Sequence, residues 1–159
     1  MLETLLVVLS LVPARSDSVE HFYALRDIDA LRSLCARTLP REDDLLCRYR
    51  LYPLVEDASL LSDIPVRLDD GTARERALLA GLWGYRASSG SIFNAMRSGR
   101  RAGRLLSQAR ELDPSEPFLL LIEGQSFLFR PGVFGGDSGR ALQLFRKLHQ
   151  VASVRHESG

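Results

Sequence analysis

The sequence predicts an all-α protein, and three features lead to that prediction. Apolar residues recur at steps of three and four along most of the chain, which is the spacing of one helix face. The alternation of apolar and polar residues that indicates strands is nearly absent. Clusters of proline, glycine and aspartate interrupt the helical pattern at short intervals, as loops do. With 159 residues the chain has the length of about one domain, which we place at residues 17–155.

Three helical segments are predicted in the first half. A stripe of apolar residues predicts a helix over 21–37, which Pro40 ends. Acidic residues open a second helix over 42–53, because negative charge stabilises a helix N-terminus. A short helical stretch follows at 55–61, and residues 63–72, with Pro65, Asp69, Asp70 and Gly71, form a connection.

The second half shows clearer boundaries. Thr72, followed three residues later by Glu75, predicts a capping box at the start of a helix. That helix breaks at 88–91, and the helix that begins near Ile92 ends at 113–114. Two further helices are predicted over 118–129 and after 137. The prediction is therefore a series of antiparallel helical hairpins.

Part of this pattern resembles the tetratricopeptide repeat, a helical hairpin with a period of about 34 residues. The residues that match it are Gly81, Ala102, Leu106, Ala109, Pro114, Gly124, Phe127, Ala141 and Phe145. Residues 72–149 resemble two such repeats with lengthened loops, and the turn at 131–137 is similar to one in exported bacterial tetratricopeptide-like proteins. The helical subunit of some periplasmic solute-uptake systems carries a similar turn. The resemblance implies hairpins stacked as a short solenoid, because a single repeat cannot bury its apolar face.

Small residues have structural roles in this prediction. Gly81, Ala102, Gly124 and Ala141 are expected to let neighbouring helices approach closely, with Pro114 closing a repeat.

The loop at 135–137 has a structural interpretation and a functional one. Gly135 and Gly136 predict a tight turn with positive φ, and Asp137 predicts an N-cap for the last helix. The backbone N–H groups of such a loop could instead bind an anion. Because the loop lacks the lysine and hydroxyl of a phosphate-binding loop, we favour the turn.

The first sixteen residues allow two interpretations. Residues 5–12 are almost unbroken in their apolar character and precede Pro13 and Ala14, which is typical of an export signal. The segment is short for a signal, and Glu3 stands where a positive charge is expected. Residues 1–16 are therefore either a signal peptide of a periplasmic or otherwise exported protein, or the first helix or free end of a cytoplasmic one.

The two cysteines also leave two interpretations open. Cys35 and Cys47 lie at similar distances before and after the turn at Pro40, on consecutive helices. A disulfide between them is geometrically feasible and would form in an oxidising compartment. Otherwise, both are small buried thiols that pack as apolar residues.

Charge gives one local clue to a partner. The formal net charge of +1 excludes a strongly electrostatic binder of nucleic acid or anionic membrane across the whole surface. Residues 86–110 nevertheless hold six arginines and no acid. We predict that Arg97, Arg101 and Arg104 contact a partner together with Phe134, the alternative being a solvated helix face.

The other aromatic residues fall into two predicted groups. Those expected to lie mostly in the core are Trp83, Tyr85, Phe127 and Phe129. Tyr49 and Tyr52 either line a groove or lie on the surface.

Motifs of catalysis are absent from the sequence. It contains no Gly-x-Ser-x-Gly, His-Glu-x-x-His or Cys-x-x-Cys pattern, and its three histidines are scattered. We therefore predict no enzyme, no metal site and no cofactor. The leading hypothesis is a protein-binding or scaffolding module of tetratricopeptide-like type with an unknown protein or peptide partner. The alternatives are a periplasmic solute-binding or transport accessory subunit, which the resemblance suggests, and an RNA-binding helical repeat.

Overall fold

The computed structural model describes residues 15–157, and these form seven α-helices and two short 3-10 helices without a strand. The elements are α1 (Arg15–Leu25), α2 (Ile28–Cys35), α3 (Arg41–Val55), η1 (Ala58–Leu61), α4 (Ala73–Ser88), α5 (Ile92–Leu112), α6 (Pro117–Phe129), η2 (Gly132–Phe134) and α7 (Ser138–Glu157). The all-α prediction is confirmed for this part of the chain. None of its helices is both long enough and apolar enough to cross a membrane. The predicted export segment falls almost entirely on residues 1–14, outside the described range.

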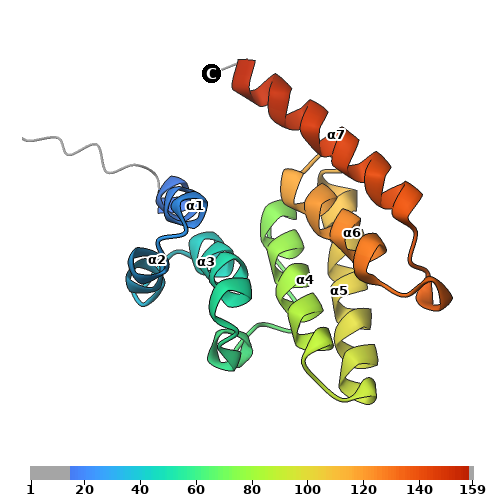
Figure 1. Ribbon diagram of the computed structural model, residues 1–159, viewed down its shortest axis with the longest axis horizontal. Helices are drawn as coiled ribbons and strands as arrows, with labels where there is room; N and C mark the ends of the chain where they lie inside the picture. Colours follow the sequence, from blue (N-terminus) through green and yellow to red (C-terminus); the bar gives the residue numbers. More distant parts are fainter. Residues whose placement is uncertain (1–14, 158–159) are drawn as a thin grey trace, which may run out of the picture.

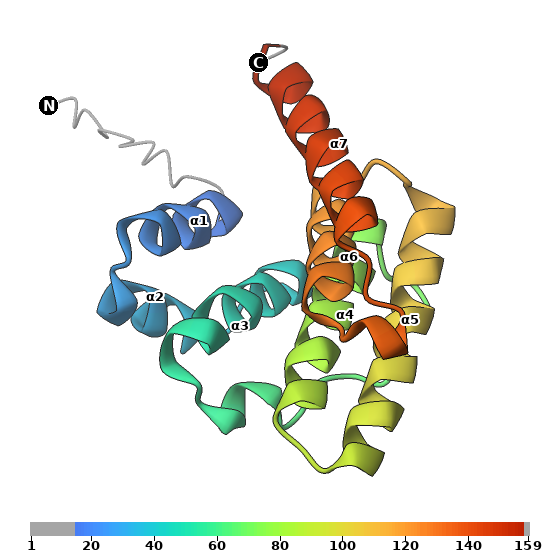
Figure 2. The same cartoon turned by 45° about the vertical axis from the view of Figure 1, so that its right-hand side comes forward.

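Neighbouring helices pack in chain order around a continuous core. The helices α1 and α2 both contact α3, α3 contacts α4, and α4 contacts α5 and α6, while α7 packs on α6. Figure 1 shows α1–α3 on one side and α4–α7 on the other, and Figure 2 shows the same order after rotation. One cluster of buried residues extends from Val19 in α1 to Ile122 in α6. The arrangement therefore leaves one long face of α5 without a neighbouring helix.

The single helix predicted over 21–37 is wrong, because the chain turns between α1 and α2. Arg26 adopts a left-handed conformation with φ of 54°. Asp27 then starts α2, and its Oδ1 accepts a hydrogen bond from the backbone N–H of Ala30 at 3.0 Å. The three-residue spacing of the apolar residues continues across this turn, which is why the pattern suggested one helix.

The helix predicted to reach Pro53 continues for two more residues. Proline lacks a backbone N–H and usually ends a helix, but Pro53 lies inside α3, in its last turn. The helix ends where Glu56 becomes left-handed, with φ of 50°. The backbone N–H of Glu56 donates to the carbonyl of Tyr52 at 2.7 Å.

A disulfide joins Cys35 at the end of α2 to Cys47 in α3. The two Cα atoms lie 5.5 Å apart, within the range that disulfides require. Cys47 is fully buried, and Cys35 is partly buried. Of the two interpretations that the sequence left open, the structure has the bridge, which fixes α2 against α3.

The capping box predicted at the start of α4 is present. The Thr72 hydroxyl accepts a hydrogen bond from the Glu75 backbone N–H at 3.1 Å, and the Glu75 carboxylate accepts one from the Thr72 N–H at 2.9 Å. The same carboxylate receives two hydrogen bonds from the Arg41 guanidinium, whose third bond goes to Asp70. These hydrogen bonds lower the pKa values of Glu75 and Asp70 below their ordinary range. They connect the start of α3 to the start of α4.

Two helical glycines lie where packed side chains leave no room for a larger residue. A Cβ atom on Gly81 would lie 2.6 Å from the ring of Tyr49, and one on Gly124 would overlap the ring of Phe145 on α7. Ala141 is buried, and Ala102 packs partly buried against the core. The α3–α4 and α6–α7 packing therefore depends on small residues.

The loop between α6 and α7 is a tight turn. Gly135 has φ of +85°, and a Cβ atom on Gly136 would overlap the carbonyl oxygen of Arg130. Asp137 begins α7, with its Oδ1 accepting a hydrogen bond from the Arg140 N–H at 3.0 Å. Pro114, in the preceding α5–α6 connection, accepts a hydrogen bond from Lys147 through its carbonyl at 2.9 Å. The turn therefore requires glycine at both positions, at Gly135 for its positive φ and at Gly136 for the close approach to Arg130.

Candidate partner-binding surface

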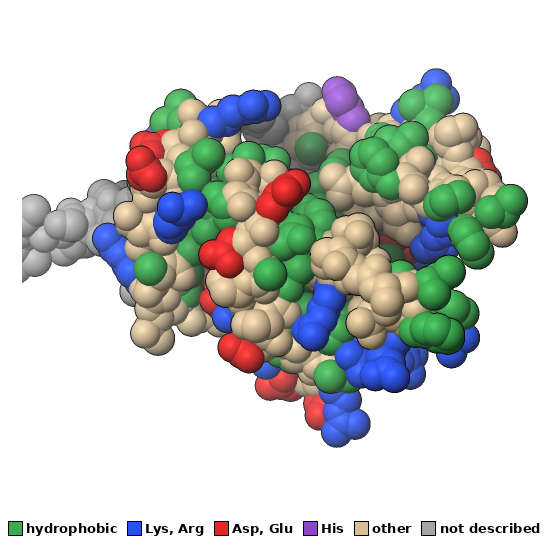
Figure 3. All heavy atoms as spheres, turned by 60° about the horizontal axis from the view of Figure 1, so that its bottom comes forward, with side chains coloured by type: hydrophobic (Ala, Val, Ile, Leu, Met, Phe, Trp, Pro, Cys, Tyr) green, Lys and Arg blue, Asp and Glu red, His purple; other side chains and the backbone are tan. Residues whose placement is uncertain are grey.

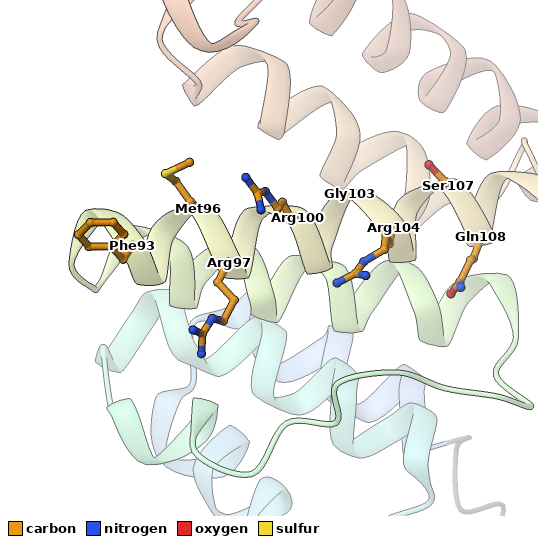
Figure 4. Close-up of a pocket in the computed structure, with 8 residues that line it drawn as sticks. All are labelled: Phe93, Met96, Arg97, Arg100, Gly103, Arg104, Ser107 and Gln108. Carbon is orange, nitrogen blue, oxygen red and sulfur yellow. The ribbon is translucent and has the colours of Figure 1, made fainter.

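One face of α5 is exposed along its whole length. The opposite face packs inward through residues such as Leu105, Leu106 and Ala109, which are buried. Figure 4 shows the exposed side chains, which line a shallow hollow open to solvent. We call this set the α5 stripe: Phe93, Met96, Arg97, Arg100, Gly103, Arg104, Ser107 and Gln108. Each step along the stripe is one or three residues, so these residues form one continuous surface.

Three arginines of the α5 stripe have no partner among the described residues. The guanidinium groups of Arg97, Arg100 and Arg104 make neither a hydrogen bond nor an ion pair there, and all three side chains are exposed. The nearest polar contact of the stripe is at its far end, where Gln108 accepts a hydrogen bond from Arg76 at 3.0 Å. The stripe therefore carries positive charge that no carboxylate in the described chain neutralises, and such charge attracts an acidic ligand.

The predicted basic face needs one correction, because Arg101 does not belong to it. The Arg101 guanidinium lies 4.5 Å from the centre of the Trp83 ring, a cation–π contact that turns it toward α4. The Trp83 indole N–H donates to the carbonyl of Pro65 at 2.8 Å, which holds the ring in place. Arg100 takes the position that Arg101 was expected to have. The spacing does not decide between them, because Arg100 lies three residues after Arg97 and Arg101 lies four residues after it.

Exposed apolar side chains adjoin these arginines. Phe93 is 80% exposed and Met96 is 55% exposed at the start of α5, next to the exposed Ile92. A second exposed apolar group surrounds the α6–α7 turn and consists of Leu128, Phe129, Val133, Phe134 and Leu142. Figure 3 shows hydrophobic side chains beside basic ones on this side of the molecule. Large exposed apolar groups of this kind mark interaction sites.

Phe134 is exposed as predicted, but it belongs to the second group and not to the α5 stripe. It is 69% exposed on η2, whereas the α5 helix has no close backbone contact with η2 or α7. Phe129 was expected in the core and is 77% exposed, because α6 ends there and no described helix covers its last turn. Trp83 is buried and Tyr85 and Phe127 are partly buried.

Tyr49 lies in the core, so neither prediction for it is correct. Its hydroxyl donates to Gln125 at 2.9 Å, and its ring stacks on Tyr85 with 5.4 Å between centres. Burial raises the pKa of both phenols, so both stay neutral far above pH 7. Tyr52 is partly buried against the same Tyr85 ring.

Within residues 15–157, no three histidine, cysteine or carboxylate side chains are grouped so that they could hold a metal ion. Comparisons with protein families, curated proteins and solved structures found no match to this chain. The function is therefore inferred from the surface of the molecule itself.

Proposed function

We propose that this chain is a non-catalytic protein-binding module that holds an acidic partner on the α5 stripe. One observation carries the proposal: Arg97, Arg100 and Arg104 are exposed and have no partner within residues 15–157, and they adjoin exposed Phe93 and Met96 on a face that no described helix covers. Arginine forms forked hydrogen bonds with carboxylates, and aromatic and methionine side chains are enriched in the contact areas of protein interfaces. Only Phe93 is aromatic along the stripe, which favours an acidic protein over the stacked bases of RNA.

We further propose that α4–α7 are two tetratricopeptide-like repeats. In support, α4 pairs with α5 and α6 pairs with α7, while α4 also packs against α6. The small residues Gly81 and Gly124 lie at equivalent places in the first helix of each pair, and each faces an aromatic ring.

The disulfide supports export of the protein to an oxidising compartment. Such bridges persist in the periplasm and outside the cell and are rare in the cytosol. We therefore propose that the acidic partner is a protein of the same compartment. We prefer this function to solute binding because the hollow along α5 is open and one-sided, whereas small-ligand sites enclose most of the ligand.

The test is partner capture by charge-reversal variants. Arg97→Glu/Arg104→Glu reverses the charge at two positions of the α5 stripe. Arg37→Glu/Arg146→Glu is the matched control, at two exposed arginines elsewhere on the surface. Each replacement changes the charge by −2, so both double variants go from +1 to −3. Immobilised proteins are incubated with extract of the native host, and retained proteins are measured by quantitative mass spectrometry.

We expect a protein that wild type and the control retain and that the stripe variant loses at least tenfold. Circular dichroism should show that both variants keep the helical content of wild type. Equal retention by all three proteins would contradict the proposed function.

A further inference from the structure

The outer surface of α5 contains two parallel rows of residues, each with the steps four, three, four. The apolar row consists of Ile92, Met96, Gly99 and Gly103, and the basic row consists of Phe93, Arg97, Arg100 and Arg104. All eight residues are exposed. These steps average about 3.7 residues, so each row follows one side of the straight α5 helix over three turns. A second helix presents its side chains in rows of the same spacing, and it can therefore lie along these two rows.

The glycines of the apolar row have no structural reason within the described chain. Nothing lies within 4 Å of a Cβ atom built on Gly99 or Gly103, whereas Gly81 and Gly124 each face a ring. Glycine in the interior of a helix destabilises it relative to alanine. At Gly99 and Gly103, one turn apart, the missing side chains leave room for large side chains of an approaching helix.

The two rows also give the approaching helix a chemical character. Figure 4 shows Met96 and Arg100 pointing to the side of α5 on which α6 lies, with Arg97 and Arg104 pointing to the other side. A helix seated on the apolar row would have Arg97 and Arg104 along one flank and Arg100 along the other, where coiled coils carry the charged residues that select a partner. These guanidinium groups have no carboxylate in the described chain, so the flanks of the incoming helix must supply acidic residues.

We propose that the α5 stripe and the apolar row together receive a single amphipathic helix of a partner protein, with apolar residues at steps of three and four and glutamate or aspartate on both flanks, facing Arg97 and Arg104 on one side and Arg100 on the other. This inference rests on the proposed function and names the partner's structure and charge. The backbone groups of α5 are satisfied within the helix, so recognition uses side chains alone, which a helix presents in matching rows.

The probe is a synthetic three-heptad peptide with leucine at its seam positions and glutamate on both flanks, labelled with fluorescein. Its glutamates repel one another, which keeps the peptide from pairing with itself. One control peptide has the same composition in an order that destroys the seam, and another carries lysine in place of glutamate. Fluorescence anisotropy gives the dissociation constant for each peptide with the full chain. We expect wild type to bind the glutamate peptide at least tenfold more tightly than either control.

Two variants separate the helix from the charge. In Gly99→Gln/Gly103→Gln, polar side chains fill the apolar row without a change in charge, and Gly84→Gln is the control at an exposed α4 glycine that also has open space around it. Both should have a higher Tm than wild type, because glutamine favours helix over glycine. Only the first should lose affinity for the glutamate peptide, by at least tenfold. Arg97→Glu/Arg104→Glu should instead prefer the lysine peptide.

The outcomes distinguish the inference from the function on which it rests. If the glutamine double variant binds as wild type does while arginine reversal abolishes binding, the proposal of an acidic partner holds and the proposal of a helical partner is wrong. If arginine reversal also leaves binding unchanged, both proposals are wrong. Two other results would overturn the helix: concentration-dependent dimerisation of wild type that the glutamine variant abolishes, or sedimentation with phosphatidylglycerol vesicles in place of peptide binding.

Discussion

Replacing Gly81 by alanine should destabilise the protein, although alanine is the better helix former. The new Cβ atom would lie 2.6 Å from Cε2 of Tyr49 and 3.1 Å from Cδ1 of Ile122, against an ordinary contact of about 3.5–4.0 Å. The ring cannot easily withdraw, because Tyr49 is buried, donates a hydrogen bond to Gln125 and packs edge-on against Phe118.

The magnitude follows from three contributions. Overpacking of a core costs about 1–3 kcal/mol, and alanine returns about 1 kcal/mol of helix propensity. The Tyr49 ring must shift to make room, which breaks its hydrogen bond to Gln125 and adds a cost of about 1 kcal/mol. The free energy of unfolding of Gly81→Ala should therefore fall by about 1–3 kcal/mol, with a Tm lower by about 2–12 °C for a chain of this size.

The matched control is Gly84→Ala, three residues further along the same helix. Nothing lies within 4 Å of a Cβ atom at Gly84, which is exposed. The same substitution should therefore raise the stability there, by up to about 1 kcal/mol. Urea unfolding followed by circular dichroism gives both values under the same conditions. If Gly81→Ala proved as stable as Gly84→Ala, the close packing of α3 against α4 at Gly81 would be refuted. In a Tyr49→Leu background the cost at Gly81 should shrink, because the two sites are in contact.

Three further predictions concern stability. Thr72→Ala should lower the free energy of unfolding by about 0.5–2 kcal/mol through loss of the α4 cap, with Thr72→Ser as the conservative control in urea titrations. Reduction of Cys35–Cys47 should lower it by about 3 kcal/mol for a separation of 12 residues, and a double Cys→Ser variant should melt identically with and without reductant. Hydrogen bonds from Arg41 lower the pKa of Glu75 in the folded protein, so on acidification the Glu75 carboxylate is protonated first in the unfolded chain. The free energy of unfolding should therefore fall below about pH 4.5. In a Glu75→Gln variant this fall should be smaller.

The boundaries of α4–α7 were predictable because local chemistry determines them. A capping box starts α4, a proline in the first turn starts α6, and an aspartate N-cap starts α7. Each signal involves only residues within one turn, so no information about distant parts of the chain is needed. The all-α class follows from the same local signals together with the spacing of apolar residues.

Features that depend on distant residues were missed. Arg100 and Arg101 are equivalent in the sequence, and only the position of Trp83 on α4 decides which guanidinium stacks on the Trp83 ring. Phe129 was placed in the core because aromatic residues usually lie there, but its burial depends on whether another helix covers the end of α6. The left-handed Arg26 leaves the apolar spacing intact, and the N-cap at Asp27 was the only local sign of the break.

The α5 helix shows why periodicity alone does not reveal function. Its core face, its apolar row and its basic row all recur at steps of three and four, because every face of an α-helix does. The sequence therefore gives the faces but not which of them is covered. Leu105 and Ala109 are buried, so their face of α5 is covered by neighbouring helices. Open space surrounds Gly99 and Gly103, so no described helix covers their face. A helix that carries two destabilising glycines on an exposed apolar row, beside unpaired arginines, is better explained by a partner outside the chain than by anything within the described part of it.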